Sequence, residues 1–320
     1  MKKILSKILS LALALLLCLA MFSAAGADEL IKVGIINNPP SESGYRTAND
    51  NDFKANFTAE NGYEPSFAYS ILIEEQLAAF NQFVNDGVDY ILLSAASTDG
   101  WDNAIASATE AGIPVLLFDR MINNDGYVAA VVSDMAKEGE TAVNWLLAQG
   151  LEAPAVIHIQ GVMGSDAQIG RSGALDAAAA EGKATIVKQQ TGNWSADEAK
   201  AIVESVINAG TAFNVIYAEN DDMAKGAVAA LDAAGITHGV NGDVVVMGFD
   251  CNKWALKELL AGNWNYDGQC SPFQAGVLDT IIKGLEAGEI PADKLIINEE
   301  KGFDANEITE ADVEQYGLGE

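Results

Sequence analysis

The segment Asn214-Val215-Ile216-Tyr217-Ala218-Glu219-Asn220-Asp221-Asp222-Met223-Ala224-Lys225-Gly226 contains the strand-to-helix junction from which the fold is built. The apolar run 215–218 predicts a buried strand, and the apolar spacing after Met223 predicts a helix. One of Asn220, Asp221 and Asp222 should cap this helix, because Asn and Asp side chains accept from its free N–H groups. Ligands of open α/β sheets bind beyond the carboxyl ends of the strands. We therefore expect the other carboxylates to face a cleft, the alternative being that all three serve only as cap and turn.

The same alternation of strand and helix continues along most of the chain. Strands are predicted at 31–36, 90–94, 115–119, 128–133, 155–160, 184–189, 215–218 and 244–249. Helices are predicted at 74–85, 101–111, 137–149, 172–180, 196–208 and 223–234. Alternating β and α elements predict parallel sheets with right-handed crossovers. The two similar halves predict an α/β protein of two doubly wound lobes, with no element assigned to the polar stretch 53–70.

The N-terminus has the features of a secretory signal peptide. Three lysines precede an apolar run at 8–22, and the small residues Ala25-Gly26-Ala27 follow it. The run is shorter than the roughly 20 residues that a membrane-spanning helix needs. Cys18 raises the alternative of a lipoprotein, but Leu17 before it is bulkier than lipoprotein processing prefers. We expect cleavage after residue 27 and a soluble protein in the periplasm or outside the cell.

Charge excludes one class of partner. The formal net charge is −28 for 320 residues, and loss of the leader removes three lysines and no acid, which gives −31 for 293 residues. Nucleic-acid binding requires clustered Lys and Arg to neutralise phosphates, so a nucleic-acid partner is not expected. The mature length fits two medium lobes, and a monomer is expected.

Two cysteines, Cys251 and Cys270, remain after cleavage. An even pair outside the cytoplasm is compatible with a disulfide. The alternative is two small buried thiols, which we favour because the sequence does not give the direction of either side chain. There is no C-x-x-C motif and no His/Cys cluster at metal-ligand spacing, so neither a metal nor a cofactor is predicted.

Polar and aromatic residues follow five of the predicted strands. A sugar hydroxyl both donates and accepts hydrogen bonds, so one sugar ring can satisfy carboxylates and guanidinium groups together. Tyr45 and Trp194 offer flat faces for the apolar side of a sugar ring, whereas Trp101 is expected in the core. The alternative for Asp119 and Arg120 is a mutual ion pair that closes a loop. The five junctions are residues 41–46, Asp119-Arg120, the Gly-rich loop leading to Arg171, the Asn220 segment and Asp250.

Other chemistry is less well supported by the sequence. The Gly-rich segment 161–173 lacks both G-x-G-x-x-G and the Gly-Lys-Ser/Thr of a phosphate loop. Residues 170–173 do not form a G-x-S-x-G nucleophile elbow. Asp119 and Asp250 are candidates for a glycosidase pair. An Arg beside a carboxylate lowers its pKa, which is the opposite of what a general acid needs.

Several stretches together resemble a known family. They are Ser41-Glu42-Ser43-Gly44-Tyr45-Arg46-Thr47-Ala48-Asn49, Asp99-Gly100-Trp101-Asp102, Phe118-Asp119-Arg120, Thr191-Gly192-Asn193-Trp194, Tyr217-Ala218-Glu219-Asn220-Asp221-Asp222-Met223 and Gly248-Phe249-Asp250. With them the chain resembles the sugar-binding subunits of ATP-driven importers with the type I periplasmic-binding-protein fold, the group of ribose-binding protein. Within that group it resembles the galactofuranose-binding proteins most.

The resemblance implies a site, a domain division and a function. It makes Asp119, Arg120, Arg171, Asn220 and Asp250 hydrogen-bonding ligands, Tyr45 and Trp194 stacking partners, and Arg46 and Gln269 further contacts of the sugar. One lobe would comprise residues 28–133 and 270–294, and the other 134–269 and 295–320, with three crossings between them. The lobes would close on one pentose or hexose, galactofuranose among the candidates, without chemical conversion. The partner would be the membrane permease of an ABC importer.

Three alternatives stay open at this stage. A sugar-sensing receptor for chemotaxis or two-component signalling would share the fold and the sugar chemistry. Lactose-repressor-type regulators also share the fold, but they begin with a helix-turn-helix where this chain has its leader. A secreted carbohydrate-active enzyme is disfavoured because the sequence shows no convincing acid/base pair.

Overall fold

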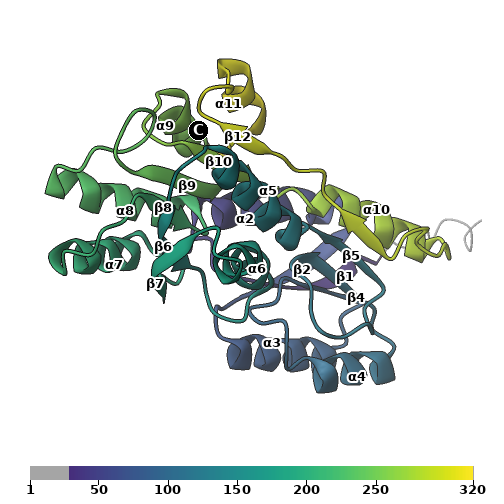
Figure 1. Ribbon diagram of the computed structural model, residues 1–320. Coiled ribbons are helices and arrows are strands. Elements are labelled where there is room, and N and C mark those ends of the chain that lie inside the picture. Colours follow the sequence, from purple (N-terminus) through teal and green to yellow (C-terminus); the bar gives the residue numbers. More distant parts are fainter. Residues whose placement is uncertain (1–28, 320) are drawn as a thin grey trace, which may run out of the picture.

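The computed structural model describes residues 29–319, which form two α/β lobes, each built on a six-stranded sheet (Figure 1). Every strand pair is parallel except β10 with β12. The two doubly wound lobes predicted from the alternation are confirmed. The predicted leader lies outside the described residues. Between residues 29 and 319, no helix is both long enough and apolar enough to cross a membrane.

The first sheet has the strand order β11-β5-β4-β3-β1-β2. Helices α3 and α4 cover one of its faces, and α2 and α10 cover the other. Strands β3 and β4 are buried throughout, as expected for parallel strands that are covered on both sides. The bounds are β1 Ile31–Asn37, α2 Gly44–Asn56, β2 Tyr63–Tyr69, α3 Ile73–Asp86, β3 Tyr90–Leu93, α4 Asp102–Ala111, β4 Val115–Asp119, β5 Ala129–Val132, α10 Ala275–Glu286 and β11 Leu295–Ile297.

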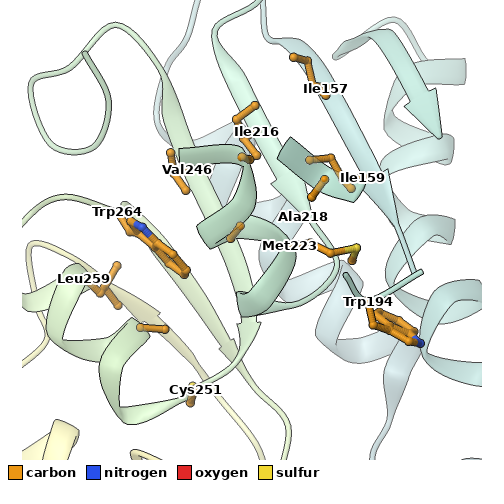
Figure 2. Packing of buried hydrophobic residues seen from close by; sticks show 14 of the residues in the cluster. Ile157, Ile159, Trp194, Ile216, Ala218, Met223, Val246, Cys251, Leu259 and Trp264 are labelled. Carbon is orange, nitrogen blue, oxygen red and sulfur yellow. The ribbon is translucent and has the colours of Figure 1, made fainter. Parts of the chain in front are cut away.

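The second sheet has the order β12-β10-β9-β8-β6-β7. Helices α7, α8 and α9 pack on one face and α5 and α6 on the other. Figure 2 shows the first of these packed faces, with Trp264, Val246 and Ile216 inside it. The bounds are α5 Met135–Ala148, β6 Ala155–Gln160, α6 Asp166–Ala180, β7 Thr185–Thr191, α7 Ala196–Asn208, β8 Val215–Ala218, α8 Asp221–Ala234, β9 Val245–Asp250, α9 Lys253–Leu260, β10 Tyr266–Gln269, β12 Gly302–Asp304 and α11 Glu310–Tyr316.

The chain crosses between the two sheets three times. It crosses after β5, after β10 and after β11. The third crossing differs from the prediction, which assigned residues 295–320 to the second lobe. Leu295 pairs with Ala130 of β5, so β11 belongs to the first sheet and the crossing follows it. The strand has only three residues and an exposed edge, which is why its pattern did not predict its place.

Helix α2 and strand β2 occupy the region where the sequence predicted loop or no element. The side chain of Ser43 accepts from the N–H of Arg46 and caps α2. Its buried face includes Arg46, Asn49 and Asp50. Hydrophobic periodicity cannot find a helix whose inward face is polar. Asn49 and Asp50 bond within the first lobe, whereas Gly44 at the start of the helix contacts Asp222 of the second.

Candidate ligand-binding site between the lobes

The carboxyl ends of strands from both sheets face one narrow cavity of about 20 Å³. This is room for about one water molecule and far below the roughly 300–1,000 Å³ of small-molecule sites, so the two lobes are closed on each other in this structure. Eight of the nine predicted site residues line it, namely Tyr45, Arg46, Asp119, Arg120, Arg171, Trp194, Asn220 and Asp250. Glu42, Ser43, Met135, Ala167 and Cys270 complete the lining. Cys270, Met135 and Ala167 gave no polar or aromatic signal, so the sequence did not mark them.

Gln269, the ninth predicted residue, is not part of this lining. It lines a separate groove together with Asn298 and Glu300, while its neighbour Cys270 lines the cavity. Successive residues of a strand point to opposite sides. A prediction that is wrong by one position at the end of β10 therefore places in the cavity a side chain that faces the groove.

Direct contacts join the lobes around the cavity. The Gly44 N–H donates to Asp222 Oδ2 at 3.2 Å on one side. The Thr98 N–H donates to the Gly164 carbonyl at 3.0 Å on the other, and the Met121 N–H donates to Asp166 Oδ2 at 2.8 Å. These contacts make the cavity narrow, so a ligand can enter only when the lobes separate.

Asp119 organises the polar groups of the first lobe. Its carboxylate accepts from the Tyr45 hydroxyl at 2.9 Å, from Arg46 at 2.6 Å and from the Ser94 hydroxyl at 2.7 Å. Burial alone would raise the pKa of Asp119, but Arg46, Arg120 and these hydrogen bonds hold it below its usual value. Asp119 is therefore a fixed negative charge throughout the neutral range. The Tyr45 hydroxyl is part of this network, a role beyond the predicted stacking.

The two arginines beside Asp119 differ in what they offer a ligand. Arg46 also donates to Glu42 at 3.1 Å and to Asn37 at 3.1 Å, so protein acceptors occupy most of its guanidinium. Arg120 Nε lies 3.4 Å from Asp119 Oδ2 and is buried without a hydrogen bond to any of residues 29–319. Burial and the charge of Arg46 lower the pKa of Arg120. Arg120 is thus the donor of the first lobe that is available to a ligand, and its predicted ion pair with Asp119 is long.

Arg171 organises the second lobe. Its Nε donates to Glu138 at 2.7 Å, one terminal nitrogen donates to Asp250 at 3.2 Å, and the other donates to the Glu219 carbonyl. Gly170 makes this geometry possible, because a Cβ there would lie 2.4 Å from the Met135 carbonyl carbon. Helices α5 and α6 therefore pack closely enough for Glu138 on α5 to reach Arg171 on α6.

Asp250 differs from Asp119 in its ionisation. Burial, together with the charges of Glu138 and Asp222, raises the pKa of Asp250 to about 7, although Arg171 acts in the opposite direction. This corrects the expectation that an adjacent Arg would lower it, because the cost of desolvation exceeds the attraction of one guanidinium. The cavity therefore contains one carboxylate with a depressed pKa and one with an elevated pKa.

The three polar residues that follow β8 have three different roles. Asn220 Oδ1 accepts from the Met223 N–H at 2.9 Å, which confirms the predicted cap and leaves the Nδ2 group for the cavity. Asp222 contacts Gly44 of the other lobe. Asp221 is fully buried against Asn252, so the expectation that both remaining carboxylates face the cleft is wrong for Asp221.

Trp194 presents an aromatic ring at the edge of the second lobe's core. Figure 2 shows it beside Met223, with its nitrogen end turned away from that residue. The indole Nε1 is buried without a hydrogen-bond partner in the described part of the chain. Trp101, by contrast, is 1% exposed within the first lobe's core, as predicted.

The position of Trp194 depends on Gly161. A Cβ at Gly161 would lie 1.8 Å from the indole ring. We expect Gly161→Ala to displace the ring and to weaken ligand binding about threefold to tenfold, the equivalent of roughly 0.5–1.5 kcal/mol of aromatic contact. Isothermal calorimetry measures the change. Gly173→Ala is the control, because a Cβ there meets nothing within 4 Å; equal affinity in both variants would contradict the predicted role of Trp194.

Buried acids make stability depend on pH. Burial raises the pKa of Asp166 to about 6, of Asp250 to about 7 and of Glu300 to about 9. These groups bind protons more tightly in the folded state, so the free energy of unfolding decreases as pH rises. The stabilisation is complete below the ordinary carboxyl values near pH 4 and is lost as pH passes through these raised values.

Thermal unfolding should therefore occur at a higher temperature at about pH 5 than at about pH 9. Calorimetric scans across this range test the sign. In Asp250→Asn the slope near neutral pH should become shallower, since one of the titrating groups is gone. A midpoint that rises with pH would contradict the assignment. The depressed pKa of Asp119 makes stability fall as pH decreases, which is the opposite direction, but this effect is confined to more acidic solution.

Cys251 and Cys270 are both buried free thiols. This agrees with the free-thiol alternative favoured from the sequence. Cys251 lies beside Asp267 of β10, and Cys270 lies beside Ser133 at the first crossing.

Comparison with known proteins agrees with this geometry. Residues 33–276 match the family described as periplasmic binding protein domain. The fructose import binding protein FruE of Bifidobacterium longum is 30% identical over 301 residues, covering 90% of each chain. The galactofuranose-binding protein YtfQ of Escherichia coli is 30% identical over 261 residues, covering 78% of this chain and 81% of that protein. The arabinose-binding component from Shewanella sp. ANA-3, solved with α- and β-L-arabinofuranose, superimposes with a TM-score of 0.79 at 28% identity, covering 86% of this chain and 92% of that one. The two lobes, the site between them and these matches show that the chain belongs to the periplasmic binding protein domain family.

Proposed function

We propose that this protein is an extracytoplasmic receptor that captures one monosaccharide between its lobes and delivers it to the membrane permease of an ABC importer. The observation behind the proposal is that charged groups from both lobes line a single cavity. Asp119 and Arg120 come from the first lobe, and Arg171, Asn220 and Asp250 come from the second. The protein acts as a monomer in the periplasm or outside the cell, and it releases the sugar unchanged.

The division of these groups between lobes supplies the mechanism. A sugar in contact with both sets binds the closed form better than the open form. Only such a difference in affinity shifts the population toward closure. Periplasmic binding proteins in general close around their ligand by a hinge motion. The conformation that the permease contacts then depends on whether sugar is bound.

The proposed ligand is a pentose or hexose in its furanose form. The names of the galactofuranose-binding and arabinofuranose-bound relatives support this class. The balance of donors and acceptors around the cavity suits a polyhydroxylated ring once the lobes have separated to admit it. Arg120 and Asn220 would donate to hydroxyl oxygens, and Asp250 would accept from a hydroxyl group.

A monosaccharide panel tests the proposal. Thermal-shift measurements and calorimetry should include galactose, arabinose, fructose and ribose, with ring-locked furanosides beside the free sugars. We expect saturable binding of at least one sugar and a rise in the unfolding temperature, because a ligand that binds only the folded state stabilises it. If no sugar in the panel bound, the proposed ligand class would be wrong.

One observation favours a second candidate function. The opposite pKa shifts of Asp119 and Asp250 within one cavity are also the arrangement of an acid/base pair. A glycoside hydrolase would convert aryl glycosides or oligosaccharides and release products. Incubation followed by chromatography separates the two functions, since a receptor returns every sugar unchanged.

A further inference from the structure

The three segments that cross between the lobes meet at Glu300. The Ser133 hydroxyl of the first crossing donates to Glu300 Oε1 at 2.7 Å. The Ser271 N–H of the second crossing donates to the same oxygen at 2.6 Å. Glu300 itself belongs to the third crossing, between β11 and β12. One carboxylate therefore links all three strands of the hinge.

Two further ligand-type groups lie beside Glu300. Ligand atoms of Glu138, Cys270 and Glu300 all lie within 4.8 Å of one another. Glu138 is 7% exposed, and its Oε2 accepts from Arg171. Its other oxygen, Oε1, is buried and has no hydrogen-bond partner in the described part of the chain. An unpartnered carboxylate oxygen inside a protein is costly, so this arrangement calls for a proton or a cation.

We propose that Glu138, Cys270 and Glu300 form a divalent-cation site of the zinc class at the hinge. Zinc accepts thiolate and carboxylate ligands together, whereas calcium and magnesium select oxygen. In tetrahedral geometry, Zn–S and Zn–O bonds of about 2.3 and 2.1 Å place two ligand atoms roughly 3.4–3.6 Å apart. The three groups, whose ligand atoms lie within 4.8 Å of one another, therefore have to approach by up to about 1 Å to surround one ion.

Charge and access are compatible with such an ion. The negative charge of two carboxylates and a thiolate is larger than the single positive charge of the adjacent Arg171. Glu138 and Glu300 also line the groove of about 430 Å³ that contains Gln269 and Asn298. This groove gives an entry path and lets water occupy the fourth position that three protein ligands leave open.

An ion here would act on the hinge and on the cavity together. It would connect the second and third crossings to α5 of the second lobe. Cys270 also lines the cavity, and Glu138 holds Arg171. The ion would therefore stiffen the hinge and alter sugar affinity without touching the sugar.

Zinc titration of the purified exported protein, after treatment with a chelator, tests the site. We expect one zinc ion per chain by calorimetry. Glu300→Gln and Cys270→Ser should each weaken zinc binding more than about tenfold. Two matched controls should bind as the wild type does. Glu299→Gln removes the same charge from an exposed neighbour, and Cys251→Ser removes the other buried thiol.

Cadmium gives a spectroscopic readout that does not depend on sugar binding. The ultraviolet absorption of a cadmium–thiolate bond should develop in the wild type and in Cys251→Ser and be absent in Cys270→Ser. If the Cys270 variant failed to fold, Glu300→Gln alone would decide between the outcomes. Absence of zinc binding in the wild type, or equal binding in Glu300→Gln, would overturn the proposal and leave a proton shared by Glu138 and Glu300 as the occupant.

Discussion

Replacing Asp250 by asparagine is expected to lower sugar affinity by tenfold or more while the fold stays intact. A charged hydrogen-bond acceptor contributes on the order of 1.5–3 kcal/mol, which corresponds to a factor of about ten to a hundred or more. Asparagine keeps the size of the side chain, and it tolerates the positive φ of 108° at this position better than most residues. Asp250→Ala should abolish measurable binding, because it also removes the neutral hydrogen-bonding group.

The stability of this variant is the second half of the prediction. Asp250 has a raised pKa, so its charged form is less stable in the folded protein than in water. Removing the charge should leave the unfolding temperature unchanged or raise it. Calorimetric titration and thermal scans measure both quantities, with the exposed Asp293→Asn as the control. Unchanged sugar affinity in Asp250→Asn would show that this carboxylate is not a ligand.

Replacing Asp119 by alanine should have the opposite effect on stability. This carboxylate is 2% exposed and contacts Arg46 and Arg120, both of which are buried. Its removal leaves two guanidinium groups without their shared partner inside the protein. Loss of one member of a buried ion pair costs about 3–5 kcal/mol, and the hydrogen bonds from Tyr45 and Ser94 are lost as well. Sugar binding should be lost together with the stability.

Urea unfolding measures the loss through the shift of the transition midpoint at constant slope. Asp119→Asn should fall between the wild type and Asp119→Ala, since it keeps one acceptor oxygen but no charge. The rank order of stability is then Asp250→Asn at or above the wild type, followed by Asp119→Asn and Asp119→Ala. An Asp119→Ala midpoint equal to that of the wild type would contradict the network described for the first lobe.

The fold could be predicted from sequence wherever apolar residues follow the period of a strand or helix. Strands 115–119, 155–160 and 215–218 and helix 196–208 have the predicted bounds. Helix α2 was missed because Arg46, Asn49 and Asp50 occupy its buried face. Residues that serve a site replace the apolar residues on which the periodicity rule depends.

Most of the residues that line the candidate site could also be predicted, because polar residues at strand ends stand out against the buried strands. Contacts between segments that are far apart in the sequence could not be predicted. Glu138, Cys270 and Glu300 are separated by most of the second lobe's sequence, and motif spacing detects only local ligand sets. Gln269 pairs with Asp250 at the ends of β10 and β9, yet only Asp250 lines the cavity. Asp250 has a φ of 108°, and sequence periodicity does not predict this departure from regular strand geometry.

The backbone contacts between the lobes have a consequence for uptake at low sugar concentration. The bonds from Gly44, Thr98 and Met121 join one lobe to the other, so they stabilise the closed form even when no sugar is bound. A molecule in that shape cannot admit sugar, and the apparent dissociation constant increases in inverse proportion to the fraction that is open. Replacing the accepting carboxylates of Asp222 and Asp166, neither of which lines the cavity, would therefore retune the concentration at which scavenging begins while leaving untouched the groups that do line it.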